Sequence, residues 1–278
     1  MHEMLFKGGL DKAFTASYDD GLITDERLKN IFDANAIKCT FNINYSLMQP
    51  CGAALPEKIT KENMWTRARL NDYVALMKDS GHEIAIHGYT HSDPAKFDDD
   101  EAFEEYSKDK KALEETFGTV IRGCAYAFGN FNEASKKALK KLGIHYSRTV
   151  KSTFSFDIPE HRITLDPTCH HNENILELGK KFLSDNERKA KLFYLWGHSC
   201  ELEVDGKWSE MEEFAGLIGR RGDVWYATNI EIFDYIDAYN ALEFSENEKF
   251  VYNPSALDVW LDIGGETWIA RAGKITKL

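Results

Sequence analysis

Long apolar runs, a positive net charge and paired cysteines are all missing from this 278-residue chain. No apolar run approaches the ~20 residues of a membrane-spanning helix, so no membrane span is predicted. Residues 1–10 lack the basic and then apolar pattern of a signal peptide, and we expect a cytoplasmic protein unless an export segment precedes this sequence. The formal net charge is −12, whereas nucleic-acid and anionic-membrane surfaces need clustered Lys and Arg. We therefore expect no nucleic-acid partner.

The five cysteines are odd in number and form no Cys-x-x-Cys pair. Free thiols in a reducing compartment are therefore expected, and a disulfide framework is not. The cysteines are Cys39, Cys51, Cys124, Cys169 and Cys200. An apolar content of 43% and a charged content of 29% are ordinary for a globular protein. The length allows one large α/β domain or two average ones.

Short apolar strands alternate with amphipathic helices from residue 12 to residue 242. Strands are predicted at residues 12–18, 37–43, 83–86, 120–126, 144–148, 163–165, 191–196 and 224–227. Helices are predicted after Thr24 as N-cap and at 67–80, 98–117, 132–142, 172–184, 210–221 and 230–242. Residues 49–63 have little periodicity and are expected to form a long loop. Because no nucleotide-binding glycine fingerprint is present, this alternation predicts a distorted (β/α) barrel of seven or eight units.

After residue 245 the pattern changes to alternating apolar residues, among them Leu257, Val259 and Leu261. Gly264-Gly265 then separates two short apolar segments, which is typical of a two-residue hairpin turn. We predict that residues 1–245 form the barrel and that residues 246–278 form a small β-hairpin appendage on it.

The stretch His82–His91 places two histidines at the end of a predicted strand. His87 comes directly after residues 83–86, and His91 follows four residues later. If the chain becomes helical there, positions i and i+4 share one face and both imidazoles reach one point. Such a pair can bind a divalent metal such as zinc, although a lone His-x-x-x-His is more often a surface turn with unrelated histidines.

Other polar side chains follow the remaining predicted strands, and the active site of a βα barrel lies at those carboxyl ends. In chain order the ends carry Asp19 and Asp20, Asn42 and Asn44, His87 and His91, Tyr126 and Phe128, Arg148, Asp166 and His170, and Trp196 and His198. Most residues capable of catalysis therefore fall at one rim, which predicts an active site there.

An aspartate and two histidines form a recurrent hydrolytic metal shell that leaves a position for water. Asp19 and Asp20 are adjacent and cannot both reach a metal usefully from the same direction. We expect one of them to bind the metal and the other to accept a proton from water. Zinc lowers the pKa of a water to about 7, so an ordinary carboxylate can serve as the base. Taken alone, Asp19-Asp20-Gly21 is typical of a surface turn.

Four segments in this order resemble the motifs of polysaccharide deacetylases, the NodB-homology domains of carbohydrate esterase family 4. Residues 17–21 (S-Y-D-D-G) resemble the first motif, T-F-D-D-G, and residues 87–91 (H-G-Y-T-H) resemble the second, H-[ST]-x-x-H, with Gly in its second position. Residues 125–129 (A-Y-A-F-G) are similar to the third, R-x-P-Y-G, and residues 195–198 (L-W-G-H) to the last, an apolar strand that ends in His. The resemblance covers roughly residues 10–200, and the order and spacing of the motifs make it specific.

The resemblance implies metal-dependent removal of N- or O-acetyl groups from an amino sugar or an acetylated glycan of the chitin, peptidoglycan or xylan type. By position it implies Asp19 as the base and His198 as the acid that protonates the leaving amine. It implies Asp20, His87 and His91 as the ligands of one divalent metal, expected to be zinc, with cobalt, nickel or manganese as alternatives. A backbone N–H near Phe128 would hold the oxyanion together with the metal.

Two departures from the family's motifs concern the partners of the base and the acid. Ala125 stands where the third motif has arginine. We expect Arg148 to hold the base carboxylate instead, with Arg122 as a weaker candidate and an exposed, solvated Arg148 as the alternative. The Asp that orients the acid histidine in the family is not recognisable. Asp166 is placed for that role, and for His170 we expect a structural or surface role.

Aromatic residues near the rim can stack on sugar rings, although aromatic side chains are also the usual core filler. We expect Tyr126, Phe128, Trp196 and Tyr89 to contact the substrate. Tyr45, Trp65 and Trp225 are further aromatic residues near the rim.

Two other interpretations stay open. One is a hydrolase of a small amide or ureide on the same barrel, which Ala125 mildly favours. The other is a carbohydrate-binding protein that has lost catalysis, which the intact Asp19 and His198 oppose. The oligomeric state is not predicted.

Overall fold

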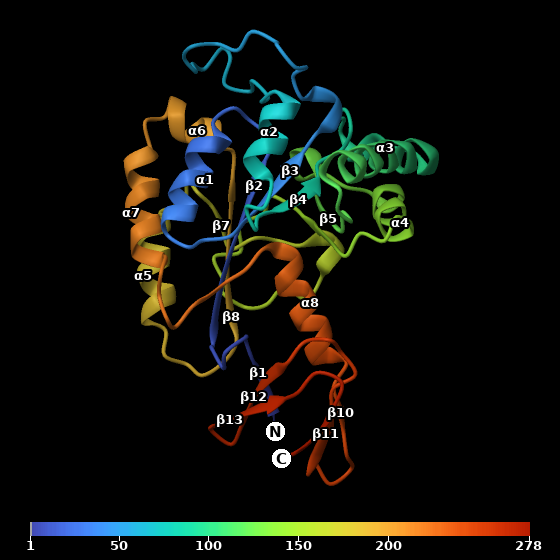
Figure 1. The fold of residues 1–278 in the computed structure, drawn as a ribbon, viewed down its shortest axis with the longest axis vertical. Helices are drawn as coiled ribbons and strands as arrows, with labels where there is room; N and C mark the ends of the chain where they lie inside the picture. Colours follow the sequence, from blue (N-terminus) through green and yellow to red (C-terminus); the bar gives the residue numbers. More distant parts are fainter. Residues whose placement is uncertain (1) are drawn as a thin grey trace.

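The computed structural model describes residues 2–278, and its centre is a curled parallel sheet flanked by helices (Figure 1). The strands are β2 (Lys12–Asp19), β3 (Cys39–Ile43), β4 (Glu83–Ile86), β5 (Gly123–Ala125), β6 (Tyr146–Arg148), β7 (Cys169–His170), β8 (Lys191–Gly197) and β9 (Trp225–Tyr226). Their order is β6-β5-β4-β3-β2-β8-β7, and β9 pairs with β2. Every pairing is parallel. The predicted α/β barrel with its strand ends at one edge is confirmed.

The sheet does not close completely, because its order ends at β6 and β7. An isolated parallel bridge from Arg148 to Leu165 partly spans the gap. The strand predicted at 163–165 is wrong: Arg162–Thr164 form a 3-10 helix, and the sixth strand of the parallel sheet along the chain is β7. A three-residue apolar run does not distinguish a strand from a single turn.

Eight α-helices accompany the strands of the described part of the chain. They are α1 (Asp25–Ala34), α2 (Leu70–Met77), α3 (Asp99–Phe117), α4 (Glu133–Lys141), α5 (Ile175–Ser184), α6 (Ser199–Val204), α7 (Trp208–Ile218) and α8 (Asn229–Asn240). α3 matches the helix predicted at 98–117; it begins with a capping box at Asp98 and has Gly118 as its C-cap. Thr24 is the N-cap residue of α1, as predicted, but its side chain makes no capping hydrogen bond, because its hydroxyl is hydrogen-bonded to the Ser199 hydroxyl at 2.6 Å. The six-residue α6 was not predicted, because it is too short to show a periodicity.

β2 and β8 form the central pair of the sheet. They are in register from Lys12↔Lys191 to Tyr18↔Gly197, and every residue of both strands is buried. Phe14 of β2 packs edge-on against Phe193 of β8, with the ring centroids 5.5 Å apart. A doubly covered parallel pair of this kind resists displacement. It therefore holds the residues that follow it in fixed positions.

A small β region lies at one end of the molecule beside α8, away from the long loop between β3 and α2 (Figure 1). Its strands are β1 (His2–Leu5), β10 (Glu243–Phe244), β11 (Phe250–Tyr252), β12 (Val259–Ile263), β13 (Glu266–Ala270) and β14 (Ile275–Lys277). The β12–β13 hairpin turns at Gly264-Gly265, both with positive φ, as predicted. β1 was not predicted, and it pairs with β12. The C-terminal segment is therefore joined to the start of the chain.

The structure also bears on the cysteines and on membrane-spanning helices. All five cysteines are free, and four are buried, whereas Cys51 in the long loop is exposed. None of the helices within residues 2–278 combines the length and the apolar composition that a bilayer crossing requires.

Gly123 in β5 leaves room for the Tyr146 side chain. A Cβ at this position would lie 2.2 Å from the Tyr146 hydroxyl oxygen, and Tyr146 is fully buried with its hydroxyl donating to Glu83 at 2.8 Å. We expect Gly123→Ala to lower the free energy of unfolding by about 1–3 kcal/mol, because the core is overpacked. Urea denaturation measures this change.

Gly216 in α7 supplies the matched control, since no atom lies within 4 Å of a Cβ placed there. Gly216→Ala should raise the free energy of unfolding by up to about 1 kcal/mol through helix propensity. A similar change in both variants would mean that the contact with Tyr146 has been overestimated.

Candidate active site

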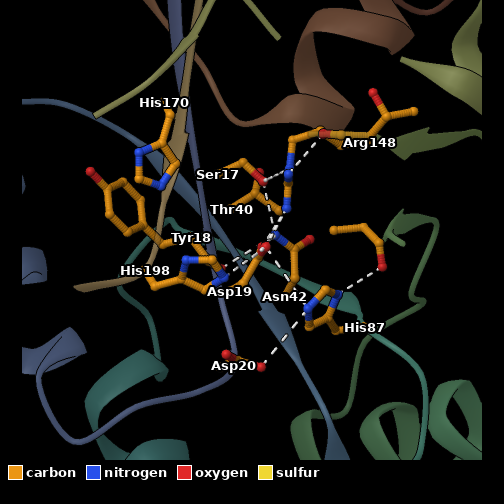
Figure 2. A network of polar contacts seen from close by, with 12 residues as sticks. Ser17, Tyr18, Asp19, Asp20, Thr40, Asn42, His87, Arg148, His170 and His198 are labelled. Atoms are coloured by element: carbon orange, nitrogen blue, oxygen red, sulfur yellow. Dashed lines mark hydrogen bonds and ion pairs between the residues drawn. The ribbon is translucent and has the colours of Figure 1, made fainter. Parts of the chain in front are cut away.

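The carboxyl ends of the central strands surround one cavity of about 710 Å³, within the roughly 300–1,000 Å³ of small-molecule sites. Its lining residues are Asp19, Asp20, Trp65, Arg67, His87, His91, Tyr126, Phe128, Val150, Trp196 and His198. Figure 2 shows Asp19 at the centre of this group, with His87, Arg148 and His198 turned toward it. The structure thus brings together residues from segments that are far apart in the sequence.

Asp20, His87 and His91 converge as a possible metal site. Their nearest ligand atoms all lie within 4.8 Å of one another, and Nε2 of His91 is 3.6 Å from Oδ1 of Asp20. Nδ1 of His87 lies 2.8 Å from the Ala125 carbonyl oxygen. Because a carbonyl can only accept, Nδ1 carries the proton, and the Nε2 lone pair of His87 faces the cavity.

Burial is the main cause that lowers the pKa of His91, to about 4, and neighbouring His87 adds to the effect. His91 is therefore neutral near pH 7, which is the form that ligates a metal.

The two histidines converge through a loop and not through the helical turn considered from the sequence. Gly88 has φ +85° and His91 has φ +58°, so both residues lie outside the right-handed helical region. A Cβ on Gly88 would lie 3.2 Å from Oε1 of Glu105, which accepts the Thr90 N–H at 2.7 Å. Both the positive φ and this close approach favour glycine at the second position of the motif.

Asp20 is held by groups that the sequence did not mark. Its backbone adopts φ +86°, and its N–H donates to the Asn42 carbonyl at 2.8 Å. Arg67, 8% exposed, donates from Nη2 to Oδ1 of Asp20 at 2.7 Å and to Oδ1 of Asn44 at 3.3 Å. Arg67 follows an irregular loop, where no periodicity or motif signals a role.

Asp19 forms a buried ion pair with Arg148. Nη2 of Arg148 donates to both carboxylate oxygens, at 2.6 and 2.5 Å, and the Asn42 side chain donates at 2.8 Å. Burial is the largest single effect and opposes ionisation of Asp19, but Arg148, His87 and His198 together outweigh it and lower the pKa of Asp19 to about 2. Arg148 is 0% exposed, so the alternative of a solvated arginine is wrong. Arg122 lies elsewhere and pairs with Asp234.

His198 lies at the end of β8 with its ring between two carboxylates. Nε2 is 3.8 Å from Oδ2 of Asp19, and Nδ1 is 3.3 Å from Oε1 of Glu201. Burial lowers the pKa of His198, but the surrounding carboxylates, Glu201 first, outweigh burial and raise it overall. Glu201 was missed in the sequence, although it follows His198 by three residues.

The expectation that Asp166 orients His198 is wrong. Asp166 accepts a hydrogen bond from the Thr149 hydroxyl and lies 3.7 Å from Nζ of Lys151. It precedes β7 and lies in the connecting segment, because the strand begins at Cys169 and not at residue 163. His170 packs against Trp196 and faces Glu201 at 3.1 Å, so it is not a free surface residue.

Three of the four aromatic residues expected to contact substrate line the cavity: Tyr126, Phe128 and Trp196. The Tyr126 hydroxyl donates to the Ile163 carbonyl at 2.9 Å. Because the hydroxyl is already paired, the aromatic ring is the part of Tyr126 that can contact a substrate. Tyr89 is not part of the lining and stacks on Tyr45 instead, with the centroids 6.1 Å apart.

Trp65 and Phe128 are the most exposed aromatic residues that line the cavity. They are 48% and 58% exposed, and their rings meet the rings of His198 and His91 edge-on. Trp65 lies on the long loop, so this loop supplies one wall of the cavity.

The Arg148–Asp19 pair generates a stability prediction. Arg148→Met leaves the Asp19 charge buried without a partner and should lower the free energy of unfolding at pH 7 by about 3–5 kcal/mol. Because the folded-state pKa of Asp19 is depressed, this contribution is present above pH 4 and is lost as the pH falls toward 2. Urea denaturation at pH 7 and pH 3 should show the loss shrinking at pH 3.

Arg122→Met is the matched control, because the Arg122–Asp234 pair is about one-third exposed. Its loss should be about 1 kcal/mol or less. Comparable losses at both arginines, or a loss in Arg148→Met that is independent of pH, would contradict the assignment of a buried ion pair.

Comparison with known proteins agrees with the sequence motifs. A model of the polysaccharide deacetylase family matches residues 8–147, about half of the chain. A protein from Mycobacterium smegmatis, provisionally named a polysaccharide deacetylase, is 16% identical with a TM-score of 0.58 over 86% of this chain and 94% of that one, and it shares the fold.

Two further solved structures are more distant. A family 4 carbohydrate esterase from Streptomyces lividans in complex with acetate is 14% identical, with a TM-score of 0.48 over 75% of this chain and 88% of that one. A family 4 acetyl xylan esterase from Clostridium thermocellum in complex with a cobalt ion is also 14% identical, with a TM-score of 0.48 over 80% and 90%. The comparison with curated proteins found no match. As its motifs predict, the chain belongs to the polysaccharide deacetylase family.

Proposed function

We propose that this protein is a metal-dependent hydrolase that removes N- or O-acetyl groups from an amino sugar or an acetylated glycan. One observation carries the proposal. Asp20, His87 and His91 converge beside an ionised Asp19, and His198 faces the same cavity. This set contains a place for a metal, a base and an acid, which are the parts that amide hydrolysis requires.

One carboxylate oxygen and two imidazole nitrogens are a donor set that suits zinc and leaves a position open. The tautomer of His87 and the neutral state of His91 agree with this use, as does the hydrogen bond from Arg67 that orients the Asp20 carboxylate. When bound, such a metal polarises the scissile carbonyl and lowers the pKa of water. Zinc is the metal proposed, with cobalt, nickel and manganese as alternatives.

Asp19 is the proposed base. Its carboxylate takes a proton from the attacking water, and Arg148 and Asn42 fix its orientation by the contacts given above. His198 is the proposed acid, because its Nε2 faces the cavity on the side of Asp19 and a poor leaving amine must be protonated as it departs. The reacting bond would lie between these two groups.

The walls of the cavity fit a ring with apolar faces. Trp65 is 48% exposed and can stack on a sugar, as aromatic side chains with exposed faces do, whereas Trp196 lines the cavity but is only 8% exposed. Phe128 adopts φ +59° beside the cavity, a backbone strain that is common at functional sites. A backbone N–H near Phe128 is the proposed donor to the substrate oxyanion.

A second candidate is hydrolysis of a small amide or ureide by the same groups. The largely apolar walls of Trp65, Phe128, Val150 and Trp196 favour it, because they offer few polar partners for the hydroxyls of a long glycan. A panel of acetylated sugars and simple amides separates the two candidates.

The metal assignment predicts that His91→Ala loses the metal and keeps the fold. His91 contributes one of three ligands and lies in a loop, so its removal should lower the affinity for zinc without unfolding the sheet. Metal content after dialysis measures the loss, and circular dichroism checks the fold.

His161→Ala, at an exposed histidine outside the site, is the control for a general loss of imidazole. A His91→Ala protein that still holds one equivalent of zinc would remove His91 from the ligand set.

The activity prediction concerns Asp19→Asn. The wild-type protein should release acetate from chitooligosaccharides or peptidoglycan fragments, and this variant should keep its metal while kcat falls by about 10²–10⁴-fold. Acetate release and metal content are measured on the same samples.

Asp72→Asn, at an exposed carboxylate of α2, is the matched control and should retain activity. If Asp19→Asn loses metal and activity together, the roles of Asp19 and Asp20 have been exchanged. Should the wild type release no acetate and instead cleave simple amides, the second candidate is favoured.

A further inference from the structure

Glu201 faces three histidines, one of which is the proposed acid His198. It lies in the first turn of α6, and its Oε1 is 3.3 Å from Nδ1 of His198. Its other oxygen, Oε2, lies 3.1 Å from Nε2 of His170 and 3.1 Å from Nε2 of His171. None of Glu201, His170 and His171 falls within the four motif segments of the family.

The His171 ring is buried in a space that the surrounding residues leave open for it. The residue is 1% exposed and stacks on Tyr18, with the centroids 5.7 Å apart. A Cβ on Gly197 would lie 2.0 Å from Nδ1 of His171, so glycine in β8 is needed to admit this ring. Burying an unsatisfied polar group costs about 1–3 kcal/mol, and an apolar ring would avoid that cost. An imidazole at this buried position is therefore explained by the interaction of its Nε2 with Glu201.

Several atoms of this cluster lack an aligned hydrogen bond within residues 2–278. They are both ring nitrogens of His171, Nδ1 of His198 and Oε2 of Glu201, all of them buried. Catalytic hydrogen bonds are often poorly aligned without substrate and tighten when it binds. These atoms therefore lie at hydrogen-bonding distance from one another but without ideal alignment.

A contact with the backbone fixes the tautomer of His170. Nδ1 of His170 accepts the Asn172 N–H at 3.1 Å, so the ring proton of neutral His170 is on Nε2, which faces Glu201. A metal at Nε2 would need a lone pair there. The contact therefore favours N–H donation to Glu201 over metal binding, although His170, His171 and Glu201 lie close enough together for a metal.

The carboxylate in the middle of this cluster stays charged. Burial raises the pKa of Glu201, but the three imidazoles, His170 first, outweigh burial and hold it well below its usual range. The charged groups that face His198 are Glu201 from α6 and Asp19 and Asp20 from the end of β2, with His170 and His171 behind Glu201. Of these, Glu201 is the one on the Nδ1 side of the ring.

We propose that Glu201, held by His170 and His171, is the positioning residue of His198. Its carboxylate accepts the Nδ1 proton of His198, fixes the ring and directs Nε2 into the cavity toward the leaving group. Glu201 thus takes the position on His198 that was expected of Asp166. The inference rests on the proposed function only in naming His198 as the acid, because the pairing itself can be tested without a substrate.

The first test is a titration of the His198 ring by NMR, assigned by the resonance that disappears in His198→Ala. The pKa of His198 should fall by about 1–3 units in Glu201→Gln, because an opposite charge at this distance has been removed. Glu201→Asp, which keeps the charge but shortens the side chain, should give a smaller fall. Glu203→Gln removes the same charge from the same helix, away from the cluster, and should leave the titration unchanged. An unchanged titration in Glu201→Gln would overturn the pairing.

The second test compares two substrates. With an unactivated acetamide, Glu201→Gln should lower kcat about 10- to 100-fold, and the alkaline limb of the kcat/KM profile should move to lower pH. With p-nitrophenyl acetate, whose leaving group departs without protonation, kcat should change less than about threefold. Equal losses on both substrates with an unmoved limb would make Glu201 merely structural. If the wild type hydrolyses neither substrate, the proposed function fails while the titration still decides the pairing.

Metal content separates this proposal from a second metal site. Wild-type protein and Glu201→Gln should each bind one equivalent of zinc. Two equivalents in the wild type and one in the variant would overturn the proposal in favour of a metal held by His170, His171 and Glu201.

Discussion

The buried ion pair between Arg148 and Asp19 is the interaction on which the site depends. Two opposite charges with almost no exposure are stable only when each remains paired, since the loss of one partner leaves the other charged and desolvated. The pair joins β2 to β6, strands that are not neighbours in the sheet, across the inside of the barrel. It therefore fixes the Asp19 carboxylate relative to a strand four places away in the sheet.

The rest of the site follows from this arrangement. Asp19 is held by Arg148, whereas Asp20, with a positive φ, meets Arg67 and the two histidines of the loop after β4. His198 then reaches Asp19 from the other side, at the end of the buried strand that pairs with β2. Each aspartate thus has its own arginine, and this separates the proposed base from the proposed metal ligand.

The sequence predicted those parts of the site that local patterns encode. Strands with continuous apolar runs, such as 191–196, were found because burial on both faces leaves such a run. The candidate site residues were then identified because they directly follow these strands in the sequence. Arg67 and Glu201 were missed because their roles depend on contacts between distant segments. Asp166 was misassigned because the position of β7 is set by its pairing with β8 and not by a local apolar run.

The central claim is that Asp20, His87 and His91 bind the metal of a hydrolase. Anomalous diffraction at the zinc absorption edge, on crystals of the protein grown with zinc, tests it most directly. The account predicts one strong peak bonded to these three side chains at about 2.0–2.2 Å, with Asp19 and Glu201 outside the coordination shell. No peak at saturating zinc, or a sole peak among His170, His171 and Glu201, would contradict it.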